Sequence, residues 1–398
     1  MTGHAGVERA GAAPRIAVLG VSGGRVPAGT EALLAGAGVV AGGRAVLAAL
    51  APRDARRVVL GAGIAAALEQ LPAEPGSVCV LASGDPGFFG IVRALGDAAG
   101  PERLDVHPAP SSVALAFARL GLPWDDALVV SAHGRDPRPA INTALRHPKV
   151  AILTEPRSPA ALIAAALDGR TVLVAEALGT PAERIRPAAP GLEYAEPNVV
   201  IALDPAEPHD SGRAHRWALP EDAFAHRAGM ITKAEVRAVA LAALGPGTGD
   251  LVWDVGCGSG SVAIECARLG AAAIAIDSDA DAITLTSRNA EAHGVPVRTV
   301  HGAAPDVLAE LPDPDAAFVG GGGGALDAIL DHVAPRIHRA VVVTVAIVER
   351  IAPALERLSS HGLDASATTI QASRLRPLAG GHRLAAENPV TVITGRRT

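Results

Sequence analysis

The feature that most constrains this fold is a regular alternation of short β-branched runs with stretches rich in Ala and Leu. In the first half the strands are predicted at RIAVLG, VCVLAS, ALVVSAH, VAILT, TVLVAEAL and NVVIAL, and helices at 31–37, 112–120 and 159–167. Such alternation is typical of α/β folds, in which helices cover a mainly parallel sheet. Aromatic residues make up only 2% of the chain, which agrees with layers packed from small aliphatic side chains.

The alternation resumes in the second half, after a segment without periodicity. Residues 205–221 gather Pro, His, Gly and charge, as linkers do. Beyond them, strands are predicted at LVWDVG, AIAIDSD, VRTVHG, AAFVGG and AVVVTVAIV, with a helix after each of the first four, and two late strands near 365–373 and 389–395. No short repeat links the halves, and 398 residues exceed what one core usually supports. We therefore predict two different α/β domains, 1–205 and 223–398, joined by a linker over 206–222.

Composition limits the partners and the compartment. The formal net charge is -6 and no block of basic residues occurs, which argues against nucleic-acid and membrane-surface binding and favours a small-molecule substrate. Three cysteines without a CxxC pair predict reduced thiols in a cytoplasmic protein. No apolar run is long enough for a membrane-spanning helix, the N-terminal sequence is unlike a signal peptide, and no His/Asp/Glu spacing suggests a metal site.

A glycine-rich loop, WDVGCGSGS, follows the first strand of the second domain and opens a helix. Glycines let the backbone turn tightly and approach a ligand closely. The next strand ends at Asp277, where a carboxylate can accept both hydroxyls of an adenosine ribose. Asp254 precedes the loop, and the amino group of an amino-acid ligand favours such a carboxylate over a helix N-terminus.

The glycine spacing distinguishes two ligand classes. The dinucleotide pattern is G-x-G-x-x-G, but Ser261 stands where its third glycine belongs and Gly260 comes one place early. A G-x-G-x-G loop after an acid resembles the methionine-binding loop of class I, Rossmann-like methyltransferases, which use S-adenosylmethionine. A nicotinamide-dependent oxidoreductase, a module that binds the donor without turnover, and an ordinary tight turn with Asp277 as a helix N-cap remain alternatives.

The run FVGGGGG, residues 318–324, ends the fourth strand of the second domain. Nucleic-acid methyltransferases that act on amino groups are expected to carry an Asn/Asp-Pro-Pro-aromatic element there, which this chain lacks. A run of glycines forms a flat surface without side chains, which suits a bulky planar substrate. A flexible loop is an equal alternative.

Several motifs of the second half together resemble the decarboxylating precorrin methyltransferase domain of cobalamin biosynthesis. They are GMITKAEVRA, WDVGCGSGSVAIE, the turn Gly302-Ala303-Ala304-Pro305, FVGGGGG and LAGGHRLAAENPVTVITG. The first half is similar to the tetrapyrrole (class III) methyltransferase fold, in SGDPGFFG, PSSVALAFARLGLPW, SAHGR and LTEPRSPAALIAAAL. The fused arrangement resembles the precorrin-6Y C(5,15)-methyltransferase family.

The resemblance implies methylation of a precorrin at C5 and C15 with decarboxylation of the ring C acetate, by an enzyme expected to be a homo-oligomer. Another small-molecule methyltransferase that uses the same donor is the runner-up. Two departures are that the loop 20–24 lacks the family's usual Pro and that Thr344 stands where Asn is usual.

The candidate site residues follow from the loop and the resemblance. The donor-binding candidates are Thr232, Asp254, Gly256, Cys257, Gly258, Ser259, Gly260, Asp277, Ala304, Ser83, Gly84 and Asp85. The candidates for the decarboxylation site are Lys233, Glu235 and Arg237. The same segment also predicts an amphipathic helix with Thr232 as N-cap and Glu235 at capping-box spacing.

Overall fold

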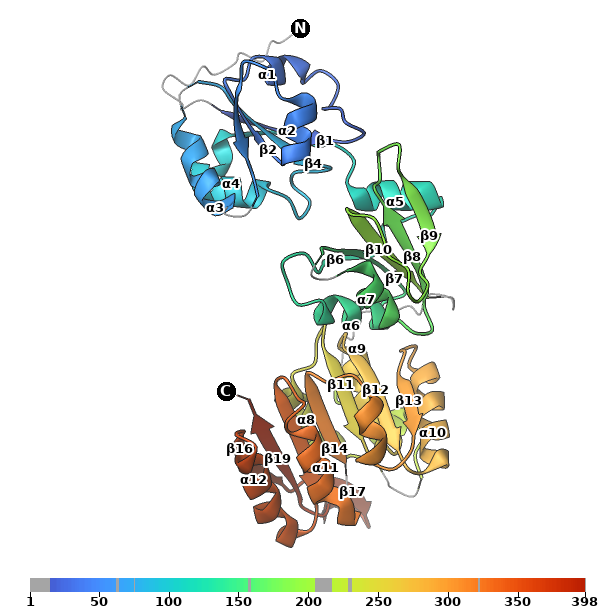
Figure 1. Cartoon of the computed structure of the whole chain (residues 1–398). Helices are drawn as coiled ribbons and strands as arrows, with labels where there is room; N and C mark the ends of the chain where they lie inside the picture. Colours follow the sequence, from blue (N-terminus) through green and yellow to red (C-terminus); the bar gives the residue numbers. More distant parts are fainter. Residues whose placement is uncertain are drawn as a thin grey trace. The chain divides into compact units, whose positions relative to one another are not determined.

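The computed structural model describes residues 15–61, 64–74, 76–156, 159–204, 217–227, 231–320 and 323–397. The chain divides into two compact units (Figure 1). One comprises Met1–Arg135, Ala151–Ala165 and Thr171–Ala202, and the other Asp136–Val150, Ala166–Arg170 and Leu203–Thr398. The predicted division at 206–222 stays a prediction, because residues 205–216 lie outside the described part of the chain.

The N-terminal region begins with a parallel five-stranded sheet in the order β3-β2-β4-β1-β5. Its strands are β1 (Ile16–Val21), β2 (Val39–Gly42), β3 (Arg56–Val59), β4 (Val78–Ser83) and β5 (Leu104–His107). Its helices are α1 (Glu31–Ala35), α2 (Arg44–Leu50), α3 (Ile64–Gln70) and α4 (Val92–Ala99), with 3-10 turns η1 (Leu71–Ala73) and η2 (Pro101–Arg103). Both faces of β1 and β4 are buried, which explains their nearly uninterrupted apolar sequences.

A second five-stranded sheet follows, in the order β6-β7-β10-β8-β9. Its strands are β6 (Leu128–Ser131), β7 (Lys149–Leu153), β8 (Thr171–Glu176), β9 (Arg184–Pro187) and β10 (Asn198–Leu203), and the helices are α5 (Ser112–Leu120), α6 (Arg138–Arg146) and α7 (Ala160–Ala165). At the end of β8 the fully buried Glu176 accepts hydrogen bonds from Arg184 and Arg186. These hydrogen bonds outweigh the effect of burial and lower the pKa of Glu176 to about 2.

The C-terminal region contains a seven-stranded sheet in the order β13-β12-β11-β14-β15-β19-β16. Strands β11 to β15 pair in parallel, and β19 runs antiparallel between β15 and β16. These strands are β11 (Leu251–Val255), β12 (Ala272–Asp277), β13 (Arg298–His301), β14 (Ala316–Gly320), β15 (Ala340–Val345), β16 (Asp364–Ile370) and β19 (Val390–Arg396). A separate antiparallel hairpin consists of β17 (Ser373–Leu378) and β18 (Gly381–Ala386).

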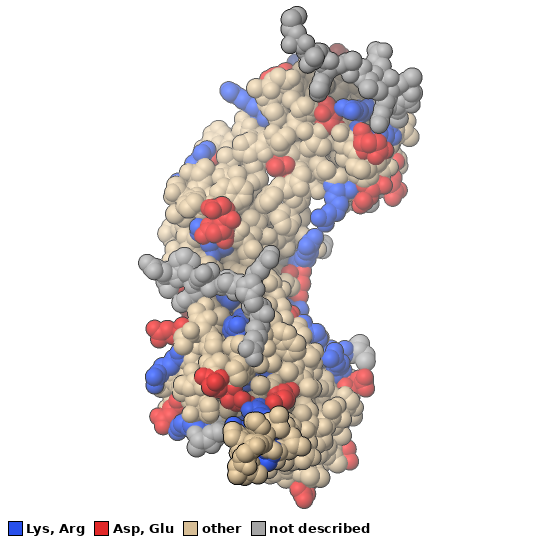
Figure 2. Space-filling model, turned by 180° about the vertical axis from the view of Figure 1, so that it is seen from behind, with Lys and Arg blue, Asp and Glu red and all other residues tan. Residues whose placement is uncertain are grey.

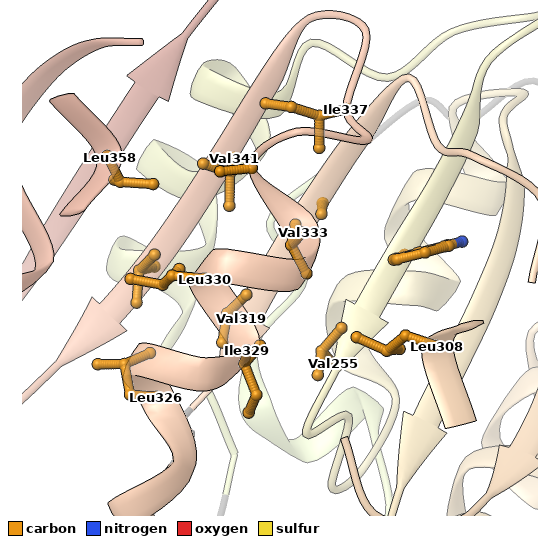
Figure 3. Packing of buried hydrophobic residues seen from close by; sticks show 14 of the residues in the cluster. Val255, Leu308, Val319, Leu326, Ile329, Leu330, Val333, Ile337, Val341 and Leu358 are labelled. Atoms are coloured by element: carbon orange, nitrogen blue, oxygen red, sulfur yellow. The ribbon is translucent and has the colours of Figure 1, made fainter. Parts of the chain in front are cut away.

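Helices pack on this sheet and complete its core. They are α8 (Ala234–Leu244), α9 (Ser261–Arg268), α10 (Ala280–Ala292), α11 (Leu326–Val333) and α12 (Ile351–Ser360), with 3-10 turns η3 (Glu221–Ala223), η4 (Asp306–Glu310), η5 (Gly323–Ala325) and η6 (Val348–Arg350). Figure 3 shows the α11 side chains Leu326, Ile329, Leu330 and Val333 among strand residues such as Val319 and Val341. Because alternate residues of a strand point to opposite faces, Val252 and Val342 instead pack with α8 on the other face.

The surface carries charge of both signs. On the face shown in Figure 2, basic and acidic side chains are interspersed over the molecule. No helix in the described residues has the length and apolar character needed to cross a bilayer.

Most predicted elements are present, and one local prediction is wrong. The predicted strands lie within one or two residues of observed ones, with two exceptions: the run AVVVTVAIV ends as a strand at Val345, and the late run near 365–373 ends at Ile370. Thr232 is not the N-cap of α8, because Lys233 holds that position and makes no side-chain capping bond. The N–H of Ala234 instead donates to the Glu221 carboxylate at 3.1 Å, so no capping box forms.

Candidate functional site

The glycine loop joins β11 to α9 at the carboxyl edge of the parallel strands. Gly256, Gly258 and Gly260 have φ values of 76°, 55° and 72°, a region that favours glycine. A Cβ at Gly256 would lie 2.3 Å from the Gly320 carbonyl oxygen, and one at Gly260 would lie 2.5 Å from Thr286 Cγ2. A Cβ at Gly258 would meet nothing within 4 Å. The outer two glycines are therefore required by packing, and the middle one borders open space.

Asp277 ends β12 beside this loop. Its Oδ2 accepts the N–H of Gly258 at 3.0 Å, and its Oδ1 accepts the N–H of Asp279 at 2.9 Å. Each carboxylate oxygen has a second lone pair, so Asp277 can still accept hydroxyl donors from a ligand. The loop and the acid that the sequence predicted as a pair are thus in direct contact.

Asp254 lies beneath the loop rather than at its surface. Its side chain is 1% exposed, and its Oδ2 accepts the N–H of Ala263 in the first turn of α9 at 2.9 Å. Its Oδ1 is buried and has no hydrogen-bond partner among the described residues. Burial raises the pKa of Asp254 to about 7, against the Ala263 hydrogen bond and with a smaller contribution from the charge of Asp277.

A cavity of about 730 Å³ opens in front of the loop. The predicted site residues that line it are Thr232, Lys233, Gly256, Cys257, Gly258, Ser259 and Asp277. Five other predicted residues of this half do not line it: Asp254, Gly260, Glu235, Arg237 and Ala304. Ala304 packs instead against the hydrophobic core cluster. Their predicted contacts with donor or substrate stay predictions.

Two cationic side chains line the cavity, and their surroundings differ. Arg227 forms ion pairs with Asp279 and Asp281, so its charge is compensated. Lys233 has no ion pair within the described ranges of the chain. Lys233 is thus the cation with charge available to an anionic ligand.

Arg237 is fully buried and supports the cavity wall from behind. Its guanidinium donates to Glu265 at 3.1 Å and to the Thr232 carbonyl oxygen at 2.5 Å, and it also donates to the Leu219 carbonyl oxygen. Glu265, in α9, accepts the N–H groups of Ala218 and Leu219. The pair therefore joins the segment before α8 to the helix that follows the glycine loop. Arg237 positions Thr232, and its own side chain is fully buried.

Glu235 takes part in a second network. Arg374, in the hairpin strand β17, donates to both carboxylate oxygens of Glu235 and of Glu221, at 2.6–3.1 Å. The hydrogen bonds from Arg374 lower the pKa of Glu221 to about 2 and also lower that of Glu235. Arg374 thereby fastens the hairpin to the first turn of α8, next to Lys233.

The cavity is also lined by residues that sequence reasoning did not select. Glu387 and Asn388 follow β18, Val390 begins β19, and Thr344 and Ala346 come from the end of β15. The late motif LAGGHRLAAENPVTVITG includes Glu387 and Asn388, but nothing in its spacing indicates which of its side chains face a ligand.

The N-terminal region has a smaller cavity of about 440 Å³. Of the three predicted donor-binding residues of this half, Ser83 and Gly84 line it, whereas Asp85 does not and instead accepts the N–H of Gly87 at 2.8 Å. The loop 21–24, which lacks the usual Pro, also lines this cavity. None of its described lining residues is ionisable.

The next groups are the cysteines and the side chains that can ligate a metal ion. Cys79, Cys257 and Cys266 are free and buried, and burial raises the pKa of the Cys79 thiol to about 12. Within the described ranges, no group of three or more His, Cys, Asp or Glu side chains is arranged to hold a metal ion.

Two protein families match this chain. The family described as "Precorrin methyltransferase domain" matches residues 222–397, and "Tetrapyrrole (Corrin/Porphyrin) Methylases" matches residues 26–190. These matches confirm the predicted fold class, a tetrapyrrole methyltransferase fold followed by a Rossmann-like class I methyltransferase fold. The sheet order of the second fold, with its antiparallel β19, agrees with that assignment.

Three similar proteins illustrate the relationship. A precorrin-6Y C(5,15)-methyltransferase (decarboxylating) from Sinorhizobium is 39% identical over 64% of this chain and 65% of that protein, so the chain spans just under two thirds of it. A protein of the same description from Mycobacterium tuberculosis is 34% identical over 74% of this chain and 77% of its own length. A probable cobalt-precorrin-6B C(15)-methyltransferase (decarboxylating) from Pyrobaculum calidifontis is 42% identical over 44% of this chain and 94% of its own length.

Proposed function

Because the chain belongs to the family of decarboxylating precorrin-6Y C(5,15)-methyltransferases, we propose that it uses S-adenosylmethionine to methylate C5 and C15 of a precorrin. In the same proposal it removes carbon dioxide from the ring C acetate, as a step of corrin ring biosynthesis. A cytoplasmic location, a homo-oligomeric state and a reaction that needs no metal are further parts of the proposal.

The cavity in front of the glycine loop is the observation that carries this proposal. It joins a loop with an open backbone at Gly258, the carboxylate of Asp277 and the ammonium of Lys233, which has no ion pair among the described residues. Ligands of open α/β sheets bind at the carboxyl ends of the strands, beside the point where the strand order reverses. Here that point lies between β11 and β14, and the cavity is located there.

The residues present fit an adenosylmethionine molecule. Asp277 would accept the ribose hydroxyls, and Gly256, Gly258 and Ser259 would border the methionine part without a bulky side chain between. Below the loop, the Oδ1 of Asp254 has no hydrogen-bond partner among the described residues and would add negative potential toward a cationic ligand when the carboxyl is ionised. The bound donor would supply a methyl group on a sulfonium centre.

Methyl transfer to a ring carbon is an in-line displacement, so the protein acts mainly by alignment and exclusion of water. The buried Arg237–Glu265 pair keeps the wall formed by Thr232 in place, and the loop fixes Asp277. Loss of carbon dioxide breaks a carbon–carbon bond, and its electron pair passes into the conjugated macrocycle. Lys233 would hold the acetate carboxylate in the orientation that this step requires.

In the N-terminal region, Ser83 and Gly84 would contact a second donor molecule in the 440 Å³ cavity. This assigns one methylation to each region and the decarboxylation to the C-terminal region. The reacting macrocycle would be taken by each in turn.

The test is the mass of the product formed by the full chain from a precorrin and adenosylmethionine. The proposal expects a methyl group at each of C5 and C15, loss of carbon dioxide and release of adenosylhomocysteine. Methylation without loss of carbon dioxide would instead favour another small-molecule methyltransferase.

Donor binding without release of adenosylhomocysteine would favour a binding module. An equilibrium titration with NAD separates the remaining rival, because a nicotinamide-dependent oxidoreductase binds NAD in preference to adenosylmethionine.

A further inference from the structure

The hairpin β17–β18 carries a charge arrangement that the fold does not need. Its register places Arg376 directly opposite Arg383. Directly opposed side chains in an antiparallel pair lie about 5 Å apart at Cβ, and like charges there destabilise the sheet. Both arginines are exposed, and neither forms an ion pair among the described residues. The pair therefore weakens an element that is already marginal as an isolated two-stranded ribbon.

The face that carries this pair is fixed by Arg374. Arg374 and Arg376 are two residues apart on β17, so their side chains leave the same face of the hairpin. Arg374 is held by Glu221 and Glu235, in η3 and the first turn of α8. The arginine face is thus the face directed toward the segment that contains Lys233. The other face exposes the opposed pair Leu375 and Leu384, which are 67% and 68% exposed.

The hairpin ends at the rim of the C-terminal cavity. Glu387 and Asn388, which line the cavity, follow directly after the last residue of β18. Arg383 lies four residues before Glu387, about 13 Å along an extended strand. An anion that extends from the cavity along the hairpin would therefore reach the opposed arginines.

We propose that Arg376 and Arg383 form a second carboxylate site, which holds peripheral carboxylates of the tetrapyrrole while its reacting acetate lies in the cavity. This inference rests on the proposed function, because it takes the substrate to be a polycarboxylate macrocycle. Guanidinium groups match carboxylates in both charge and hydrogen-bond geometry, and the register places two of them on directly opposed residues. Binding energy from such remote groups can be used to position the reacting centre.

The experiment measures binding of two porphyrins to the full chain by fluorescence titration at low salt. Uroporphyrin carries an acetate and a propionate on every pyrrole, and coproporphyrin has methyl groups in place of the acetates. We expect the double variant R376Q/R383Q to bind uroporphyrin about 10-fold to 100-fold more weakly than the wild type. The loss should be smaller for coproporphyrin, smaller in R376K/R383K, which keeps the charge, and absent in the control R298Q, an exposed arginine on β13.

Two further readouts separate binding from folding. The affinity for adenosylmethionine should be unchanged, and the melting temperature of R376Q/R383Q should equal or exceed that of the wild type, because a repulsion is removed. Unchanged uroporphyrin affinity in R376Q/R383Q would overturn the inference and leave the proposed function standing. A changed sedimentation coefficient with unchanged porphyrin affinity would overturn it in favour of contact with a second copy of the chain. If the wild type bound adenosylmethionine but neither porphyrin, the substrate class of the proposed function would itself fail.

Discussion

The two cavities of this chain are built from different chemistry. The C-terminal cavity, of about 730 Å³, has Lys233, Asp277 and Glu387 among its lining residues. The N-terminal cavity, of about 440 Å³, is lined by backbone, small apolar side chains and neutral groups such as Ser83 and Asn198, with no ionisable side chain among its described residues. Alignment alone suffices for methyl transfer, whereas decarboxylation also needs a carboxylate to be held in place. The comparison therefore supports the proposal that decarboxylation takes place in the C-terminal cavity.

The ion pairs that hold a buried glutamate in each region also differ. Replacing one arginine of each ion pair should give the largest expected change in the free energy of unfolding. Arg237 and Glu265 are both fully buried, whereas the arginines that hold the buried Glu176 have side chains 55% and 29% exposed. Arg237→Met should lower the free energy of unfolding by about 3–5 kcal/mol, because it leaves the buried Glu265 charge with only the longer ion pair to Arg268, at 3.9 Å. Arg184→Met should lower it by about 1 kcal/mol or less, since Arg186 remains beside Glu176. Thermal and urea unfolding of the full chain measure both, and equal losses would contradict the contrast.

The next prediction compares the loss of stability when one glycine from each cavity is replaced by alanine. The two glycines have nearly the same φ. Gly256 and Gly24 have φ values of 76° and 71°, but a Cβ at Gly256 would lie 2.3 Å from a carbonyl oxygen, and one at Gly24 would meet nothing within 4 Å. Both alanine variants incur backbone strain of about 1–2 kcal/mol. Only Gly256→Ala adds overpacking of about 1–3 kcal/mol. Gly256→Ala should also weaken adenosylmethionine binding at the C-terminal cavity, as calorimetric titration would show, while the same stability loss in both variants would refute the crowding argument.

A third effect concerns the pH dependence of stability and the buried acid Asp254 below the glycine loop. The pKa of Asp254 is about 7 in the folded chain, above the unfolded value of about 4. Between these values the folded state binds the extra proton, so the Asp254 contribution to stability falls as pH rises from about 4 to about 7. Asp254→Asn removes this dependence, and its melting temperature relative to the wild type should rise across that interval. If the difference in melting temperature between Asp254→Asn and the wild type stayed constant with pH, Asp254 would not titrate in this interval.

The sequence predicts the strands of the parallel core well, because these strands have a distinct apolar pattern. Strands such as β1, β4 and β11 are buried on both faces and read as continuous β-branched runs. The strands that sequence reasoning missed are short, exposed or polar, such as β3 with the sequence RRVV and β17 with SRLRPL. Local patterning carries little signal where one or both faces of a strand meet solvent.

The candidate site likewise has one part that the sequence predicts and one part that it does not. The loop 256–260 and Asp277 lie on consecutive elements of one strand–loop–helix–strand unit, so their spacing in the chain predicts their contact. Glu387 and Asn388 reach the cavity through the antiparallel strand β19, and no spacing rule relates them to the loop. The error at Thr232 has a similar cause, since the carboxylate that meets the start of α8 belongs to Glu221, outside the helix.

The most direct test of the difference between the cavities is the product formed by the Lys233→Ala full chain from a precorrin and adenosylmethionine. We expect that methyl groups are still transferred and that loss of carbon dioxide slows by about 100-fold, the scale expected when a reacting group is misplaced. Mass spectrometry would then show a methylated product that retains its acetate carboxyl. Methylation and decarboxylation that both proceed at the native rate would contradict the assignment of Lys233 and of the C-terminal cavity.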